Sequence, residues 1–301
     1  MIPLPLPIKP LPPIEEVAFS FEGVRLQLSV QRNDLIHPLI SGNKWRKLQA
    51  FLTQDSEGMQ SFGGAWSNHL LAVAALGRML HKPTIGWIRG EENRSPNHYE
   101  RWLRQLGMRL HYLTREEYKD KSICHAKAHE YYPHFLIIPE GAEPQPNFLA
   151  FDFWLAEIPT KYTHCLLSCG SGATLLGLCH ALRNKPRDLM LLGIHAVNLN
   201  QEISRLHAQS QKIWPNTLVS ANVDGKRFGK ISEQRTEIAR AFFKGTGIAP
   251  DPLYDASVLL WYYQAVKEGR LPNSHDMLWL HSGGITGWAG FESESHKLFS
   301  L

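Results

Sequence analysis

The sequence predicts an α/β protein with two domains, each a parallel sheet flanked by helices. Three observations lead to this prediction. The chain has 301 residues, 43% of them hydrophobic, which is enough for one large domain or two ordinary ones. Short apolar runs alternate with segments of helical periodicity, as is typical of parallel sheets. The stretch EGAEPQP at 140–146 interrupts this alternation and marks a crossing point between domains.

The first half of the chain contains the most regular alternation. Residues 1–14 are rich in proline and predict an extended segment packed along a surface. The residues VRLQLSVQR at 24–32 alternate like a strand. The segment SGNKWRKLQAFL at 41–52 has the apolar spacing of a helix that Asn43 could cap. Strands are then expected at 59–65, 83–90, 109–113 and 134–141, separated by helices at 67–80, 98–107 and 115–132.

The alternation resumes after the interruption, although with longer gaps between the recognisable segments. Apolar runs predict strands at 163–169, at 189–197 and at 277–284. Helical periodicity predicts helices at 173–183 and 257–269. The second part of the chain is therefore expected to form a sheet of the same kind as the first.

Charge and cysteine content narrow the class of protein. With 32 basic and 28 acidic residues the net charge is +4, a mild excess that suits anionic small molecules but not nucleic acid. The cysteines show no CxxC spacing, so a reduced, cytosolic setting fits best. No signal peptide or membrane-spanning apolar run is recognisable, and we expect a cytoplasmic protein with no membrane partner.

The helix expected at 41–52 begins with an unfavourable concentration of positive charge. Lys44, Arg46 and Lys47 occupy its first turns, where the helix dipole already repels cations. An anion bound there would turn the repulsion into attraction, and Lys44 and Lys47 are spaced to share one face. A lysine held among cations also has a lowered pKa, which favours Schiff-base chemistry. The alternative is a solvated basic face.

Three further segments have the residue types of a binding site. SCGSGATLLGL at 168–178 joins a strand to a helix through a glycine-rich turn that could surround a phosphate, or that is simply a tight connection. Ser67 and Asn68 stand at a helix start, as a cap or as a carboxylate pocket. Ser282 lies just past the carboxyl end of a strand, where α/β proteins bind ligands; the alternative is a plain turn. Cys124, His125 and His129 could bind zinc, but a solvated helix face is preferred and no metal is expected.

Taken together, these segments resemble the 1-aminocyclopropane-1-carboxylate deaminase and D-cysteine desulfhydrase family. The resemblance runs from QRNDL at 31–35 to LHSGGITG at 280–287, in the same order along most of the chain. Its most specific elements are GNKWRKLQ at 42–49 and SFGGAWSNH at 61–69. Members of this family are pyridoxal 5'-phosphate (PLP) enzymes with the tryptophan synthase β type of fold (type II PLP fold), so the resemblance implies that fold and cofactor.

The resemblance also implies a role for each candidate residue. Lys44, directly after Gly-Asn, would carry the cofactor through a Schiff base, and Lys47 would hold its phosphate. Asn68 would bond the phenolic oxygen of the cofactor, while Ser67 would receive the substrate carboxylate and assist proton transfer. Tyr254, in PLYDAS, matches an active-site tyrosine near the substrate. The glycine-rich turn would complete the phosphate site with Ser171, Gly172, Ala173 and Thr174.

Two residues compete for the pyridine nitrogen of the cofactor. We favour Ser282, because desulfhydrase-like members carry a hydroxyl residue before Gly-Gly, whereas deaminase-like members use an acid that matches Asp255. A hydroxyl partner leaves the ring nitrogen less protonated and weakens the electron sink. The chain departs from the family pattern at Trp66, where glutamine is usual, so an indole is expected near the substrate.

The resulting hypothesis is a PLP-dependent lyase or deaminase with a larger domain from residues 1–47 and 151–301 and a smaller one from 48–150. Its active site would lie between the two, and by resemblance it would be a homodimer. It would release a 2-oxo acid and ammonia from a small amino acid, with D-cysteine the leading substrate and 1-aminocyclopropane-1-carboxylate the second. The alternative is a non-catalytic protein that binds PLP or an amino acid in a remodelled pocket.

Overall fold

The computed structural model describes residues 11–52, 54–92, 95–142, 149–196, 200–225 and 229–291. These residues form two compact units, a smaller one at 37–142 and a larger one at 11–36 and 149–291. The division differs from the predicted domains at residues 37–47 and at 149–150. The helix at 43–48 packs against the first long helix of the smaller unit, and residues 149–150 begin a helix of the larger unit.

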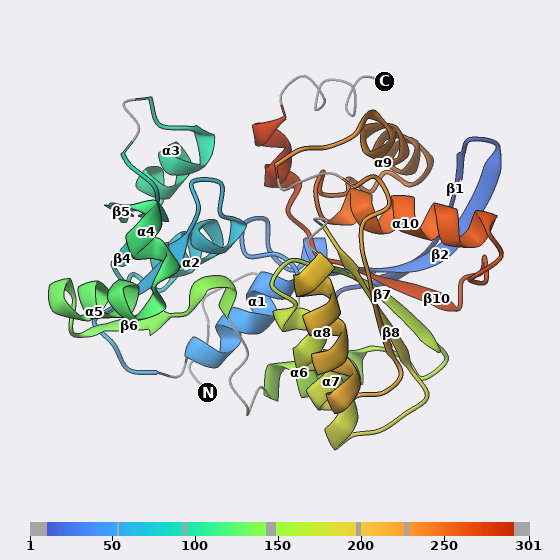
Figure 1. Ribbon diagram of the computed structural model, residues 1–301, viewed down its shortest axis with the longest axis horizontal. Coiled ribbons are helices and arrows are strands. Elements are labelled where there is room, and N and C mark those ends of the chain that lie inside the picture. Colours follow the sequence, from blue (N-terminus) through green and yellow to red (C-terminus); the bar gives the residue numbers. More distant parts are fainter. Residues whose placement is uncertain are drawn as a thin grey trace. The chain divides into compact units, whose positions relative to one another are not determined.

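The larger unit is built on a mixed six-stranded sheet in the order β1-β2-β10-β7-β8-β9 (Figure 1). The β1–β2 pair is antiparallel and every other pair is parallel. Its strands are β1 (Ile14–Phe21), β2 (Val24–Arg32), β7 (His164–Cys169), β8 (Met190–His195), β9 (Thr217–Ser220) and β10 (Met277–His281). Its helices are α6 (Leu149–Glu157), α7 (Ala173–Asn184), α8 (Asn200–Ile213), α9 (Glu233–Thr246) and α10 (Asp255–Lys267), with short 3-10 turns η1 (Asn33–Leu35) and η4 (Ile285–Gly290).

Alternating side chains of the central strand β10 enter two separate hydrophobic cores. Met277 and Trp279 join the core formed with α9 and α10, whereas Leu278 and Leu280 join the core formed with α6, α7 and α8. Figure 1 shows these two groups of helices on either side of the larger sheet. Both faces of β10 are therefore buried, which explains its continuous apolar sequence.

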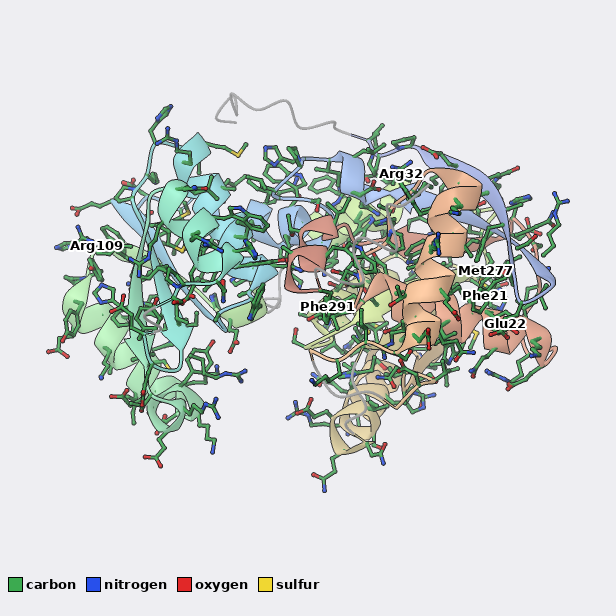
Figure 2. All side chains as sticks on the ribbon, turned by 90° about the horizontal axis from the view of Figure 1, so that it is seen from above. Phe21, Glu22, Arg32, Arg109, Met277 and Phe291 are labelled. Carbon is green, nitrogen blue, oxygen red and sulfur yellow. The ribbon has the colours of Figure 1, made fainter. Side chains whose placement is uncertain are left out.

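The β1–β2 hairpin is held at both ends. Figure 2 labels Phe21 and Glu22 near its turn and Arg32 at the end of β2. The Tyr263 hydroxyl of α10 donates to Glu22 at 2.6 Å, and its ring meets Phe21 edge-on. At the other end the Arg32 guanidinium pairs with Glu15. The hairpin thus presents β2 in a fixed register to β10.

The smaller unit is built on a four-stranded parallel sheet in the order β5-β4-β3-β6. Its strands are β3 (Gly58–Gly63), β4 (Thr84–Arg89), β5 (Met108–Leu113) and β6 (Phe135–Ile138). Its helices are α1 (Asn43–Leu48), α2 (Asn68–Met79), α3 (His98–Gln105), α4 (Arg115–Lys119) and α5 (Lys121–Tyr131), with 3-10 turns η2 (Gln49–Phe51) and η3 (Glu140–Ala142). The prediction of an α/β protein with parallel sheets flanked by helices is confirmed, except that β1 adds an antiparallel edge strand to the larger sheet.

Several predicted elements need correction. The helix expected at 115–132 is two helices, because the Asp120 side chain accepts from the Ser122 and Ile123 amides and starts α5 afresh. The extended segment expected at 1–14 lies mostly outside the described residues, and from Ile14 the chain forms β1. The sequence analysis missed β1, α6, α8, β9 and α9. No helix in the described part of the chain is both long and apolar enough to span a membrane.

Candidate active site

The first lysine of the predicted site lies at the start of a short helix. Gly42 precedes α1 with φ 60°, a left-handed conformation that favours glycine. Asn43 is the first helical residue, so the prediction that it caps the helix is wrong. Its side-chain oxygen instead accepts from the Lys44 ammonium at 2.7 Å. Asn43 therefore restrains the position of Lys44, which is half-buried.

The second lysine is more deeply buried. Lys47 is only 4% exposed, and its Nζ donates to the carbonyl oxygen of Gly141 at 2.8 Å. An ammonium has three N–H donors, so a lysine can serve more than one acceptor. The two lysines come from consecutive turns of α1, as the spacing predicted.

A buried histidine that the sequence analysis did not single out lies in the electrostatic field of both lysines. His69, in the first turn of α2, has Nε2 2.8 Å from the Ser61 hydroxyl, which itself donates to the Ile138 carbonyl at 2.7 Å. Ser61 must then accept, so His69 carries its proton on Nε2. Burial, followed by the charges of Lys47 and Lys44, lowers the pKa of His69 to about 3. The imidazole is therefore neutral at physiological pH.

This lowered pKa predicts acid sensitivity. The unfolded chain protonates His69 near its ordinary pKa of about 6.5, whereas the folded protein resists protonation down to about 3. The unfolded state therefore binds more protons between these values, and the free energy of unfolding falls as pH falls. Between pH 7 and pH 5 this one group should contribute a loss of about 2 kcal/mol.

Urea unfolding of the native protein and of His69→Gln at both pH values measures the effect. Glutamine can still donate to Ser61, so the variant should lose about 2 kcal/mol less than the native protein on acidification. His180→Gln, at an exposed position on α7, is the matched control and should follow the native protein. Equal acid sensitivity of the native protein and His69→Gln would contradict the assignment.

The start of α2 holds the next pair of predicted residues. Ser67 caps the helix, with its hydroxyl oxygen accepting the Leu70 amide at 3.2 Å, as the local pattern suggested. Asn68 follows, and its side-chain oxygen accepts the Tyr99 hydroxyl at 2.5 Å. Tyr99 is 1% exposed and comes from α3, so a buried residue that the sequence analysis missed orients Asn68. The neighbouring Trp66 is 46% exposed, with its ring centroid 5.6 Å from that of Tyr99.

In the larger unit, the glycine-rich segment forms the predicted strand-turn-helix connection between β7 and α7. Gly172 precedes the helix with φ 80°, and a Cβ there would lie 2.3 Å from a Leu206 methyl group. Within the described residues no side chain caps this helix start. Its first-turn amides, with the hydroxyls of Ser171 and Thr174, form a suitable set of donors for a phosphate.

Tyr254 packs against this turn. A Cβ on Gly170 would lie 3.2 Å from the Tyr254 ring, so the glycine allows the ring to approach the backbone closely. The Asp251 side chain accepts the Tyr254 amide at 2.6 Å and positions the residue at the start of α10. Burial, followed by the charge of Asp251, raises the pKa of the Tyr254 hydroxyl, which is therefore protonated at physiological pH.

Ser282 and Asp255, the two candidates for one role, contact each other. The Ser282 hydroxyl donates to Asp255 Oδ1 at 3.1 Å, and Ser168 Oγ, at the end of β7, lies 3.3 Å from Ser282 Oγ. Asp255 is completely buried, whereas Ser282 is half-buried at the carboxyl end of β10. Ligands of parallel sheets bind at such strand ends.

Each unit therefore brings together part of the predicted set. The smaller unit holds Lys44 and Lys47 near His69, and Ser67 beside Asn68. The larger unit gathers its members at the carboxyl ends of β7 and β10: Ser171, Gly172, Ala173, Thr174, Tyr254, Asp255 and Ser282. The residues considered as zinc ligands are used in packing: Cys124 is 1% exposed, and the His125 ring stacks on Phe62. No group of three or more metal-binding side chains occurs among the described residues.

The chain is similar to several known proteins along most or all of its length. The chain is 25% identical to a provisionally named 1-aminocyclopropane-1-carboxylate deaminase of Pyrococcus horikoshii, over all of this chain and 95% of the relative. It is 22% identical to a bifunctional mitochondrial D-cysteine desulfhydrase/1-aminocyclopropane-1-carboxylate deaminase of Arabidopsis thaliana, over 87% of this chain and 73% of the relative. The crystal structure of an ACC deaminase homologue superposes with a TM-score of 0.75 at 22% identity, over 97% and 95% of the two chains. No protein-family model matches the chain.

The chain has the tryptophan synthase β-like α/β fold, which it shares with the solved structures of the ACC deaminase homologue and of a threonine deaminase. Beyond the fold, the chain resembles proteins named 1-aminocyclopropane-1-carboxylate deaminase and D-cysteine desulfhydrase along most or all of its length.

Proposed function

We propose that the protein is a PLP-dependent lyase or deaminase that releases a 2-oxo acid and ammonia from a small amino acid. The observation that carries the proposal is the turn between β7 and α7. Its glycine conformation, its uncapped helix start among the described residues and its two hydroxyls fit a phosphate dianion. Ser171, Gly172, Ala173 and Thr174 would hold the phosphate of the cofactor there.

Lys44 is proposed as the residue that carries the cofactor. Its amine is hydrogen-bonded to Asn43. The charges of Lys44 and Lys47 both lower the pKa of His69, which is neutral. A neutral imidazole adds no positive charge to the site, so the cationic character comes from the lysines. Lys47 would donate to the phosphate while its bond to Gly141 fixes the side chain. Once a substrate amine has replaced it, Lys44 Nζ would accept and return the substrate proton.

The start of α2 is proposed as the substrate-binding and cofactor-orienting element. Because Ser67 Oγ already accepts the Leu70 amide, its hydroxyl hydrogen is directed toward another acceptor, and a substrate carboxylate suits it. The helix dipole favours the same negative charge. Because Tyr99 donates to the oxygen of Asn68, the amide nitrogen of Asn68 points away from Tyr99 and would donate to the phenolic oxygen of the cofactor.

Bound PLP supplies an electron sink for negative charge that develops on the substrate α-carbon. The protonated Tyr254, packed on the phosphate turn, would donate a hydrogen bond near the substrate. The names of the relatives favour D-cysteine and 1-aminocyclopropane-1-carboxylate as substrates. D-Cysteine is the first choice because Ser282, not an acid, is the partly exposed residue at the end of β10.

A panel of small D- and L-amino acids, scored for 2-oxo acid and ammonia, tests the proposal. Release of pyruvate from D-cysteine or of 2-oxobutyrate from 1-aminocyclopropane-1-carboxylate would support it. A purified protein that binds PLP but turns over no member of the panel would instead support the non-catalytic alternative. The same panel assigns the substrate.

Trp66→Gln tests what limits substrate choice. The indole adds bulk directly before Ser67, so we expect narrow specificity and weak activity on both family substrates. The glutamine variant should raise kcat/KM for at least one of them by about tenfold or more, equivalent to about 1.4 kcal/mol. Trp102→Gln, on α3 and also in contact with Tyr99, is the control for loss of an indole. High native activity on either substrate would show that Trp66 does not restrict the site.

A further inference from the structure

The hydrogen bonds around Ser282 define what this hydroxyl can still do. Asp255 can only accept when ionised, so the Ser282 hydrogen is committed to Asp255 Oδ1 at 3.1 Å. Ser168 must then be the donor in its 3.3 Å contact with Ser282. Ser282 is left with one lone pair and no hydrogen to offer. A ligand atom that meets this hydroxyl must therefore be a donor, such as an N–H group.

Asp255 itself is placed behind Ser282. It is 0% exposed, so it cannot reach a ligand directly, while Ser282 is half-buried. Asp255 Oδ2 accepts the Asp251 amide at 3.2 Å, which orients the carboxyl group toward Ser282. Asp255 and Ser282, which the sequence presents as alternatives for one role, are thus joined by a hydrogen bond, and only Ser282 is partly exposed.

The neighbouring histidine contacts the same carboxyl group. His281 Nδ1 lies 3.3 Å from Asp255 Oδ2 and accepts the Gly283 amide at 3.0 Å, while its Nε2 lies 3.2 Å from the Ala249 carbonyl. A ring nitrogen that accepts the Gly283 amide has no proton of its own to donate to Asp255. Burial raises the pKa of Asp255, with Asp34 adding to the rise and His281 and Ser282 opposing it. A buried carboxylate of this kind is stabilised by a cation placed one hydroxyl away.

We propose that Ser282 relays the charge of Asp255 to the cofactor, so that the pyridine nitrogen is held protonated by a carboxylate that never touches it. The inference rests on the proposed function. Asp255 is then a positioning residue, and Ser282 is the only one of the pair that contacts the ring. The relay reverses the expectation that a hydroxyl partner leaves the ring nitrogen less protonated. It gives this chain a stronger electron sink than a serine alone would provide.

The test is the protonation state of the ring nitrogen, read by ¹⁵N NMR of the holoprotein loaded with PLP labelled at that atom. The native protein should show a pyridinium signal. Asp255→Asn keeps one acceptor oxygen for the Ser282 hydroxyl but loses the second acceptor, which serves the Asp251 amide, and lacks the charge, so the pyridinium signal should be lost. Ser282→Ala should lose it as well, whereas Ser282→Thr should restore it. Ser168→Ala, which removes a neighbouring hydroxyl but leaves the bond to Asp255, is the matched control and should keep it.

The outcomes separate the relay from the proposed function. A neutral ring nitrogen in the native protein, or an unchanged pyridinium in Asp255→Asn, overturns the relay while PLP binding stands. Failure of the native protein to bind PLP overturns both. If Asp255→Asn does not fold, as judged by near-ultraviolet circular dichroism, the Ser282→Ala and Ser282→Thr pair decides the question alone.

Discussion

Replacement of Lys44 by alanine is expected to abolish covalent attachment of PLP to the protein. The native protein should be yellow, and borohydride reduction should fix the cofactor on the peptide that contains Lys44. The variant should lose this label because it lacks the amine that Asn43 restrains at the start of α1. It should still bind PLP reversibly, because the residues of the phosphate turn are unchanged. Peptide mapping by mass spectrometry after reduction measures the result.

Lys47→Ala is the comparison that separates attachment from affinity. This variant should keep the label on Lys44 but bind PLP more weakly, since it removes one charge-assisted hydrogen bond worth about 1.5–3 kcal/mol. Titration of the apoprotein with PLP measures the loss. A borohydride label found on Lys47, or no label in the native protein, would refute the assignment of Lys44.

Loss of the Asp224 carboxylate should cause the largest change in stability. Arg235, on α9, pairs with Asp224 at 2.6 Å, and the two side chains are only 1% and 6% exposed. The guanidinium also lies 3.4 Å from the Ala196 carbonyl beyond β8. Asp224→Ala leaves a buried cation without its carboxylate, so the free energy of unfolding should fall by about 3–5 kcal/mol. Chemical denaturation at pH 7 measures the change.

An exposed ion pair in the same unit provides the matched control. Arg270 and Glu268 also lie 2.6 Å apart, but their side chains are 47% and 56% exposed. Glu268→Ala should therefore cost less than about 1 kcal/mol. If Asp224→Ala cost no more than Glu268→Ala, the buried pair would not stabilise the connection between β9 and α9.

The parts of the fold that depend on local sequence were predictable. The strand before Gly170, the turn at Gly172 and the helix that follows are encoded within about twenty residues, and their periodicity and turn chemistry predicted them. The capping role of Ser67 was recognisable for the same reason. The helix α9 carries a usable signal that was overlooked, since Ile238, Ala239 and Phe242 recur at helical spacing on its buried face.

The missed features depend on partners that are distant in the sequence. Tyr99 orients Asn68 across 31 positions, and no periodic pattern relates the two residues. Asp255 and Ser282 were recognised as alternatives, but only the fold brings α10 and the end of β10 close enough for a hydrogen bond. Asn43 was predicted from its residue type to cap α1. Gly42 occupies the capping position instead, and the side-chain oxygen of Asn43 accepts a hydrogen bond from Lys44. The assigned catalytic roles remain predictions until the variants are measured.

The strand order of the larger sheet has a consequence for biosynthesis. β10 lies between β2 and β7 although it follows every other described strand along the chain. The described residues of the smaller unit all lie between 37 and 142, so they can fold on the ribosome while the remainder is still being translated. The larger sheet cannot be completed until its central strand, β10, emerges late in synthesis. Before that, one edge of β2 is unpaired. Chaperone engagement during translation should therefore concentrate on nascent chains that already expose β2 and β7 but still lack β10.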